Sequence, residues 1–227
     1  ALRSFHFKNY KPLAELVSGY RDVKITFNDD AAAVYDSSID QQLAKLLVGK
    51  ALQPGDTLLS NDPFHGGTHL PDITAISPVF CNGDQPSFFV ASRGHHADVG
   101  GIAPGSMPSF SRTIADEGLL LRNQLFVHKG RVLSADLEAV WSGMAMPPRN
   151  PPELLADLQA QVAANQAGIV ALQSLVEREG EALVQRQMTL LQRDAASSVQ
   201  RLLSRLADAR HHLALDDGSC LVVLVNL

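Results

Sequence analysis

Two short segments of the chain concentrate the residues that could do chemistry. One runs from Asn61 to Asp72 with the sequence NDPFHGGTHLPD, and the other runs from Ser92 to Gly101 with the sequence SRGHHADVGG. Neutral imidazoles and carboxylates are ligands of borderline divalent metals, and two histidines with one carboxylate leave positions open for water or substrate. His69 and Asp72, with one of the two adjacent histidines of the second segment, could supply that set. The sequence therefore indicates a metal site.

The spacing of these residues sets conditions on the local structure. Pro71 lies inside the His-x-x-Asp pair, so we expect His69 and Asp72 to be brought together by a turn and not by a helix interior. In an extended chain the adjacent His95 and His96 point in opposite directions, so we expect at most one of them as a ligand. The paired glycines Gly66–Gly67 and Gly100–Gly101 would let backbone approach a ligand closely.

The remaining histidines lack such company. An isolated His-x-x-Asp pair is most often a surface hydrogen bond, and it is the second cluster, one hairpin later, that favours the metal interpretation. We interpret the other histidines as solvent-facing or helix-capping, with the last pair near a helix end: His6, His65, His128, His211 and His212.

Other catalytic classes are not supported by the motifs present. The Gly49–Ala51 stretch lacks the upstream glycine and the Ser or Thr of a phosphate loop, so nucleotide binding by this chain is not expected. Gly105–Pro108 departs from the G-x-S-x-G nucleophile elbow, which argues against covalent serine catalysis. Cys81 and Cys220 are too few for a disulfide framework and indicate reduced thiols.

Charge and hydropathy narrow the class of protein. The 227 residues include 19 Lys and Arg against 24 Asp and Glu, a net charge of −5, which gives no basis for a nucleic-acid partner. No run of about 18 apolar residues predicts a membrane span, and the first residues lack the apolar block of a secretion signal. We therefore expect a cytoplasmic protein without nucleic-acid or membrane partners, long enough to bury a core.

The first half of the chain has the composition of short strands and constrained turns. Between Pro54 and Gly118 lie seven of the 12 prolines and nine of the 16 glycines. Asn82–Gly83 predicts a hairpin turn, because such turns need positive φ values. Short β-branched or aromatic runs predict four strands: Thr57–Leu59, Ile73–Phe80, Ser87–Ser92 and Leu119–His128.

The second half is helical by its periodicity. From Glu153 to His212 there is no proline, and apolar residues recur at steps of three and four. With Asn150 as the N-cap, the spacing predicts one helix over Leu154–Val176. Gly180 then stops or bends the chain, and a second amphipathic helix follows over Val184–Leu206.

Together these elements predict an α+β fold, in which a Gly/Pro-rich, mostly antiparallel strand region carries the site and packs with a long helical pair. We expect an atypical N-terminal segment at 1–53, a strand-rich region at 54–146, a helical region at 147–213 and the start of a further β region at 214–227. The last region holds the apolar strand Cys220–Val225, whose hairpin partner we expect outside this sequence.

The two site segments resemble a known family. Over about Pro54 to Leu206, the chain is similar in motif content and order to the hydantoinase B/5-oxoprolinase family, and Asp157–Asn165 looks like a helix of that family. The matching motifs are Gly55–Asp56, Asn61–Pro63, Gly66–Asp72, Ser92–Gly101, Pro104–Pro108 and Glu117–Gly118.

This resemblance implies an ATP-dependent enzyme of two cooperating parts in an oligomeric assembly. A hydantoinase-A-like subunit or domain would bind ATP and phosphorylate the substrate, and the B-like part would hydrolyse the activated cyclic amide of the 5-oxoproline or hydantoin type. The related acetone-type carboxylases carry a metal in the corresponding subunit. Carried across by motif, the metal ligands correspond to His69, Asp72 and His95, with Mn, Zn or Fe as the divalent ion.

A mechanism follows from this ligand set. The bound ion would lower the pKa of a water molecule, which would attack the phosphorylated amide carbon. Asp98 or His96 would take or relay the proton if one of them comes within hydrogen-bond reach. Arg93 could balance phosphate charge or serve a structural role, and Glu117 is a further candidate.

Two other functions stay open. A metal-dependent carboxylase subunit of the acetone-carboxylase type would make ATP use by the complex depend on bicarbonate instead of a cyclic amide. A non-catalytic assembly module, a truncated homologue of the family, would bind the A-like partner without a metal and without changing its ATP turnover. The intact ligand residues and Asp98 weigh against the second of these.

Overall fold

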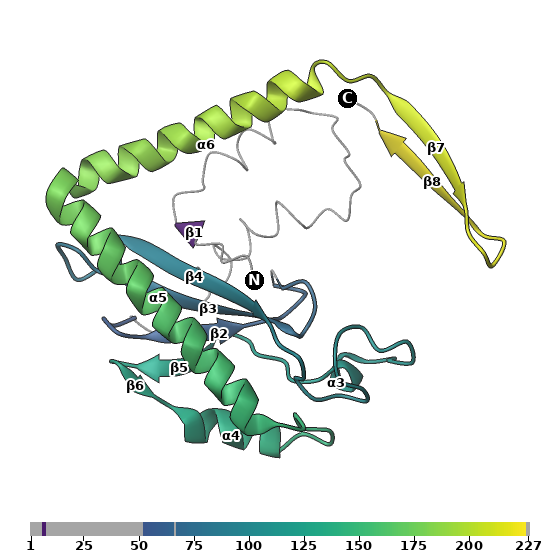
Figure 1. Ribbon diagram of the computed structural model, residues 1–227, viewed down its shortest axis with the longest axis horizontal. Coiled ribbons are helices and arrows are strands. Elements are labelled where there is room, and N and C mark those ends of the chain that lie inside the picture. The colour runs from purple at the N-terminus through teal and green to yellow at the C-terminus, as the bar shows by residue number, and fades with distance from the viewer. Residues whose placement is uncertain (1–5, 8–51, 66, 226–227) are drawn as a thin grey trace. The chain divides into compact units, whose positions relative to one another are not determined.

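The computed structural model describes residues 6–7, 52–65 and 67–225 (Figure 1). The chain divides into two compact units, and the described residues up to Glu181 belong to the first and those from Ala182 to the second. The proposed N-terminal segment at 1–53 lies almost wholly outside the described residues.

A six-stranded antiparallel sheet forms the centre of the first unit, in the order β1-β4-β3-β2-β5-β6. The predicted α+β class with an antiparallel strand region is confirmed. The strands are β1 (His6–Phe7), β2 (Thr57–Ser60), β3 (Asp72–Val79), β4 (Phe88–His95), β5 (Gln124–His128) and β6 (Arg131–Val132).

The pairing of β3 with β4 determines which residues share a face of the sheet. The two strands pair over their full lengths, with Asp72 opposite His95 and Ile73 opposite Gly94. Because side chains alternate along a strand, Asp72 and His95 point to one face and the next pair points to the other. The metal-ligand candidates of the two segments therefore meet at one corner of one face.

Helices cover the opposite face. α4 (Ser134–Ser142) and α5 (Pro151–Glu179) follow the short α3 (Ile114–Glu117), and α5 runs across β3 and β4 (Figure 1). The main core lies between this face and the helices, where apolar residues of β2, β3 and β5 pack against Leu137, Trp141, Leu154 and Leu158. Their burial supplies the hydrophobic stabilisation of the unit.

Side-chain amides of α5 reach into this layer and join the two central strands. The Nε2 of Gln161 donates to the carbonyl of Ile73 on β3 (3.0 Å) and to that of Ser92 on β4 (3.2 Å). One turn later, Asn165 donates to the carbonyl of Ala75 on β3 (3.0 Å) and to a carbonyl of β4 (3.4 Å). These bonds hold α5 in register on both strands.

The strand predicted over Leu119–His128 is shorter than expected, because only Gln124–His128 forms β5. The preceding residues bond mainly to Asn61, whose side chain is fully buried, and form no ladder with a neighbouring strand. Its Nδ2 donates to the carbonyls of Leu70 (2.7 Å) and Leu119 (2.8 Å), and its Oδ1 accepts from the N–H of Leu121 (2.7 Å). One polar side chain thus ties two loops together.

The predicted hairpin between β3 and β4 forms, but its turn was predicted wrongly. Phe80–Ser87 is a longer loop, closed by a hydrogen bond from the N–H of Ser87 to the carbonyl of Val79 (2.8 Å). Neither Asn82 nor Gly83 has the positive φ of a tight two-residue turn. The loop length removes the need for that conformation.

The glycines near the site pack against backbone of this chain, which corrects the expectation that they face a ligand. A Cβ on Gly67 would lie 2.4 Å from the carbonyl oxygen of Asn61, and one on Gly100 would lie 2.5 Å from that of Met146. Gly101 is similarly close to the backbone of Asp116. Gly66 lies outside the described residues. The glycines therefore allow the site loops to pack closely.

Gly180, with φ of 83°, ends α5 as predicted. In the second unit, α6 (Glu181–Leu203) ends three residues before the predicted Leu206, and β7 (Ala209–Ala214) pairs with β8 (Cys220–Val225). The hairpin partner of the terminal strand is thus the segment just before it. The pair His211–His212 lies on β7 and not at a helix end.

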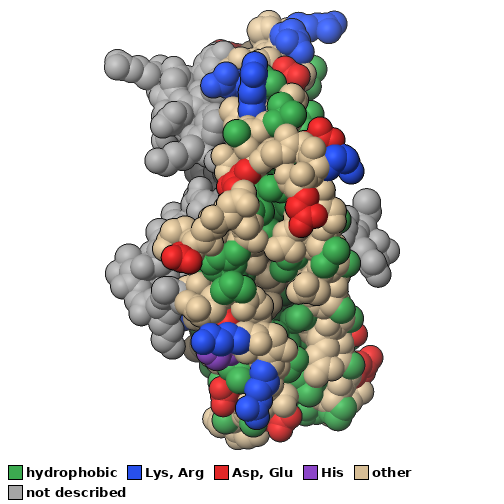
Figure 2. Space-filling view, turned by 90° about the vertical axis from the view of Figure 1, so that its left-hand side faces the viewer, with side chains coloured by type: hydrophobic (Ala, Val, Ile, Leu, Met, Phe, Trp, Pro, Cys, Tyr) green, Lys and Arg blue, Asp and Glu red, His purple; other side chains and the backbone are tan. Residues whose placement is uncertain are grey.

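Charged side chains of both signs are mixed on one face of the molecule. On the face that Figure 2 shows, Lys and Arg side chains are interspersed with Asp and Glu among the described residues. Within the part of the chain that the structure describes, no helix combines the length and apolar character that crossing a membrane requires.

Replacing Asn61 by Ala should destabilise the fold by about 3 kcal/mol, because two buried carbonyls and one buried N–H would lose their hydrogen-bond partner. The change in free energy of unfolding is measured by urea denaturation. Asn82→Ala is the matched control, since the Asn82 amide makes an exposed bond to Glu181. If Asn61→Ala lowers the free energy of unfolding no more than the control does, Asn61 does not hold the two loops together as described.

Gly100→Ala should destabilise the fold by at least about 2 kcal/mol more than Gly105→Ala. Both glycines have φ near +90°, so both substitutions carry the strain of a left-handed conformation. Only Gly100 would place its new Cβ against backbone, whereas the Cβ position on Gly105 is open. Equal shifts in urea midpoint would show that the loops do not pack as described.

Candidate metal centre

The first two ligand candidates are brought together by a tight turn, as the position of Pro71 predicts. The N–H of Asp72 donates to the carbonyl of His69 (3.0 Å), which closes the four residues into a turn. β3 begins at Asp72, so this turn delivers His69 to the strand end. A further bond, from the N–H of His96 to the carbonyl of Pro71 (2.9 Å), ties the turn to the end of β4.

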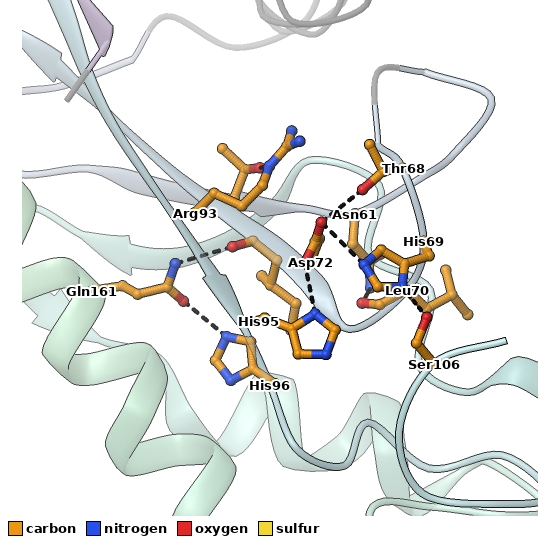
Figure 3. Close-up of polar contacts among 12 residues, drawn as sticks. Asn61, Thr68, His69, Leu70, Asp72, Arg93, His95, His96, Ser106 and Gln161 are labelled. Atoms are coloured by element: carbon orange, nitrogen blue, oxygen red, sulfur yellow. Dashed lines mark hydrogen bonds and ion pairs between the residues drawn. The ribbon is translucent and has the colours of Figure 1, made fainter. Parts of the chain in front are cut away.

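His69, Asp72 and His95 converge on one point (Figure 3). The Nε2 of His69 lies 3.1 Å from Oδ2 of Asp72, and the Nδ1 of His95 lies 2.9 Å from Oδ1 of Asp72. The two imidazole rings have centroids 5.0 Å apart and a tilt of 34°. One ligand atom from each residue lies within 4.8 Å of the others.

The charge of Asp72 suits a metal ligand. Burial alone would raise the pKa of its carboxyl, but hydrogen bonds from Thr68 and His95, with the charges of His69 and Arg93, hold the pKa below its usual value. The Thr68 hydroxyl donates to Oδ2 at 2.7 Å. The carboxylate is therefore ionised and oriented at neutral pH.

Ser106 is a site residue that the sequence analysis did not assign. Its hydroxyl makes a hydrogen bond to the Nδ1 of His69, on the ring edge away from Asp72. Metal-binding histidines generally hydrogen-bond through the second ring nitrogen, which fixes the tautomer and ring orientation. The loop that carries Ser106 has left-handed backbone at Gly105 and Met107, and the Gly-Ser-Met-Pro run is the sequence signal for it.

The two adjacent histidines have separate environments. The His95 side chain is 55% exposed and lies beside Asp72, whereas His96 is only 3% exposed and contacts α5. The Nε2 of His96 lies 2.9 Å from Oε1 of Gln161 (Figure 3). Burial lowers the pKa of His96.

Asp98 is engaged in structural bonds. Both of its oxygens bond to Arg149, and one also accepts from the N–H of Gly100. Burial would raise the pKa of Asp98, but the bonds from Arg149 and Gly100 lower it overall. Among the hydrogen bonds of the described residues, none links Asp98 or His96 to the three ligand candidates.

The two weaker candidates also have protein partners. Arg93 donates from Nε to the hydroxyl of Thr74 (2.8 Å), and these two residues pair across β3 and β4 two positions beyond Asp72 and His95. Arg93 therefore lies on the face of the metal centre. Glu117 accepts a hydrogen bond from Ser111 (3.1 Å).

Two other histidines have closer partners than the sequence indicated. The Nδ1 of His65 lies 2.8 Å from the buried Asp62, which also accepts from Arg122. The Nδ1 of His128 lies 3.0 Å from the buried Asp56. These pairs stabilise loop ends, because in each the aspartate also accepts backbone N–H bonds. The side chain of His6 is outside the described part.

The three candidates fit a divalent metal. Two imidazoles and one ionised carboxylate are a donor set that borderline ions such as Zn, Mn or Fe accept. Catalytic sites of this kind keep three protein ligands and an open position for water or substrate. All three side chains are partly exposed, at 20% for His69, 21% for Asp72 and 55% for His95, so solvent can reach the cluster.

Comparison with known proteins identifies the family. The family model for hydantoinase B/oxoprolinase matches residues 22–226, which extends the match upstream of Pro54. The chain is 43% identical to 5-oxoprolinase 1 of Arabidopsis thaliana over 168 residues, covering 70% of this chain and 13% of that protein. It is 37% identical to 5-oxoprolinase of Saccharomyces cerevisiae over 200 residues, covering 80% and 15%.

Solved structures share the fold. The ATP-dependent caprolactamase from Pseudomonas jessenii superposes with a TM-score of 0.66 at 24% identity, over 85% of this chain and 34% of that chain. An acetone carboxylase gives a TM-score of 0.54 at 20% identity, over 62% and 18%. The chain thus spans about a third or less of the proteins it matches. From the family match and these identities, the chain belongs to the hydantoinase B/oxoprolinase family.

Proposed function

We propose that this chain is the B-type part of an ATP-dependent hydrolase of cyclic amides, of the 5-oxoprolinase or hydantoinase type. The observation that carries the proposal is the convergence of His69, Asp72 and His95 at a solvent-facing strand end. The similarity to 5-oxoprolinases supports the reaction class. Because the chain spans only a small share of those relatives, activity is proposed for the whole assembly.

A divalent ion bound there would polarise a substrate oxygen and lower the pKa of water. The chain's own residues would prepare the centre for it. Asp72 provides the ionised carboxylate, Thr68 orients it, and Ser106 holds the His69 ring so that Nε2 faces the ion. The open side of the cluster would admit the amide carbonyl of the substrate.

Arg93 is suited to the phosphorylated substrate. It lies on the same sheet face as Asp72 and His95, two strand pairs further along, and its charge already acts on Asp72. A guanidinium in this position can pair with phosphate oxygens. We propose that Arg93 balances phosphate charge while its bond to Thr74 fixes its direction.

The proton relay remains as proposed from the sequence, with His96 preferred over Asp98. The oxygens of Asp98 are occupied by Arg149 and Gly100. His96 retains one ring nitrogen without a hydrogen-bond partner among the described residues. A relay through His96 requires a connecting water or substrate group, because Gln161 is its direct partner.

The assembly is proposed to include a hydantoinase-A-like part that binds ATP. Two exposed apolar side chains, close in the chain to residues of the cluster, support contact with a further surface. Phe64 is 76% exposed in the loop before His69, and Met107, beside Ser106, is 72% exposed. Apolar side chains in such positions are often covered by a partner or substrate.

A carboxylase subunit of the acetone-carboxylase type is the second candidate. The same ligand set would serve it, and an acetone carboxylase shares the fold. The identities of 37 to 43% with 5-oxoprolinases favour the hydrolase. A non-catalytic module is the least supported alternative, since it gives no account of the ligand cluster.

His69→Ala and Asp72→Asn should each lower the affinity for a divalent metal at least about tenfold, because each removes one of three protein ligands. Metal content is measured by elemental analysis of the purified chain, and affinity by competition with a chelator. His65→Ala is the matched control, because His65 also pairs with an aspartate three residues away. Metal retained equally in all variants would reject the ligand assignment.

His95→Ala in the assembled enzyme should abolish cyclic-amide hydrolysis, with a loss of at least about 10³-fold in kcat, because the remaining ligands cannot hold the ion in place. The assay follows 5-oxoproline or hydantoin-dependent ATP use together with ring opening. Bicarbonate-dependent ATP use with a ketone would instead favour the carboxylase. Full activity in His95→Ala would contradict the proposed centre.

A further inference from the structure

A second polar pocket lies where the end of β4 meets the first turns of α5. Its lining includes His96, Asp98, Asn150, Glu153 and Asp157, none of which belongs to the metal centre. It is a small hollow that is partly open to solvent. His96 follows His95 directly in the chain and contacts α5, so the pocket lies on the helix side of the strand end.

The hydrogen bonds of Gln161 fix the tautomer of His96. The amide nitrogen of Gln161 donates to two backbone carbonyls, on Ile73 and Ser92. A flipped amide would put its oxygen against those two oxygens, so Oε1 must face His96. An amide oxygen only accepts, and therefore the Nε2 of His96 carries the hydrogen.

This arrangement leaves the other nitrogen as a buried acceptor. In the neutral ring with hydrogen on Nε2, Nδ1 presents a lone pair. His96 is 3% exposed, and its Nδ1 has no hydrogen-bond partner among the described residues. Figure 3 shows Nε2 turned toward Gln161 and the second nitrogen turned away from it. Buried polar atoms nearly always have a partner, so a donor is missing here.

The charges around the pocket favour a positively charged donor. Asp98 is neutralised by Arg149, and Asn150 donates to Glu153 without changing its charge. The carboxylate of Asp157 makes no hydrogen bond to another described residue. Asp157 and Glu153 therefore give the lining of the pocket a net negative charge.

A bare metal ion does not suit this pocket. Among the described residues, the three ligands of the metal centre are the one group of His, Cys, Asp or Glu whose atoms converge closely enough to share an ion. The ligand must therefore carry its own hydrogens to reach both Nδ1 and the carboxylates. A primary ammonium group has three N–H donors and a single positive charge, as Lys does.

We propose that this pocket binds a primary ammonium group, with the Nδ1 of His96 as its buried acceptor, Asp157 and Glu153 as its anionic side, and Gln161 as the positioning residue for His96. Binding is independent of the metal centre. Opening of a cyclic amide produces an amino group of this kind, so a role in holding the product rests on the proposed function, whereas the binding itself does not.

The test uses the intact chain with ¹⁵N-labelled histidine and methylammonium chloride as the probe. Long-range ¹H–¹⁵N NMR should show hydrogen on Nε2 of His96, and methylammonium should shift the Nδ1 resonance saturably. Tetramethylammonium chloride is the control, since it has the same charge and no N–H. A hydrogen found on Nδ1, or equal shifts with both salts, would overturn the proposal.

Variants separate the roles of the residues. Gln161→Met should allow both tautomers of His96. Methylammonium binding should then weaken about tenfold, because Nδ1 is no longer held as a hydrogen-bond acceptor for the ammonium group. Asn165→Leu, which removes a similar amide bond between α5 and both strands, should leave the His96 tautomer unchanged.

Asp157→Asn alters an exposed side chain, so it should fold normally, weaken methylammonium binding about tenfold and preserve the tautomer. Unchanged methylammonium binding in Asp157→Asn would contradict the proposal that Asp157 supplies negative charge to the bound ammonium group. An unchanged tautomer in a folded Gln161→Met would overturn the positioning role. Because no arm measures metal or hydrolysis, these outcomes are separate from failure of the proposed function.

Discussion

The direct pairing of Asp72 with His95 across β3 and β4 is the constraint on which the candidate metal centre depends. Side chains alternate with a period of two, so a slip of one residue in either strand would send one ligand to the helix-covered face. The pairing continues without a bulge from this end to Val79 and Phe88. The centre is therefore as well defined as the register of the two central strands.

That register is reinforced from the helix side. Gln161 and Asn165 each donate to a carbonyl of β3 and to one of β4, so a slip of one strand against the other would break bonds at two turns of α5. The polar residues of a long amphipathic helix thus do more than face solvent. Their amides fix the relative position of strands whose far face carries the ligands.

The sequence was sufficient for the class of fold and the long helices, because each has a local signal, and it placed the three candidate ligands in two short segments that the structure brings together. Periodicity marks α5 and α6, and Pro71 requires the turn that joins His69 to Asp72. The features that it missed depend on distant contacts. Asn61 holds residues 58 and 60 positions away, and Ser106 reaches His69 over 37 positions. Neither spacing is visible as a pattern in one sequence.

Two adjacent histidines illustrate how a strand end can serve two sites. His95 completes the candidate metal centre on one face, and His96 is held by α5 on the other. The N–H of His96 also bonds to the carbonyl of Pro71, within the turn that carries the other two ligands. The backbone of His96 thus supports the turn of His69 and Asp72, while its side chain is held on the helix side of the strand end.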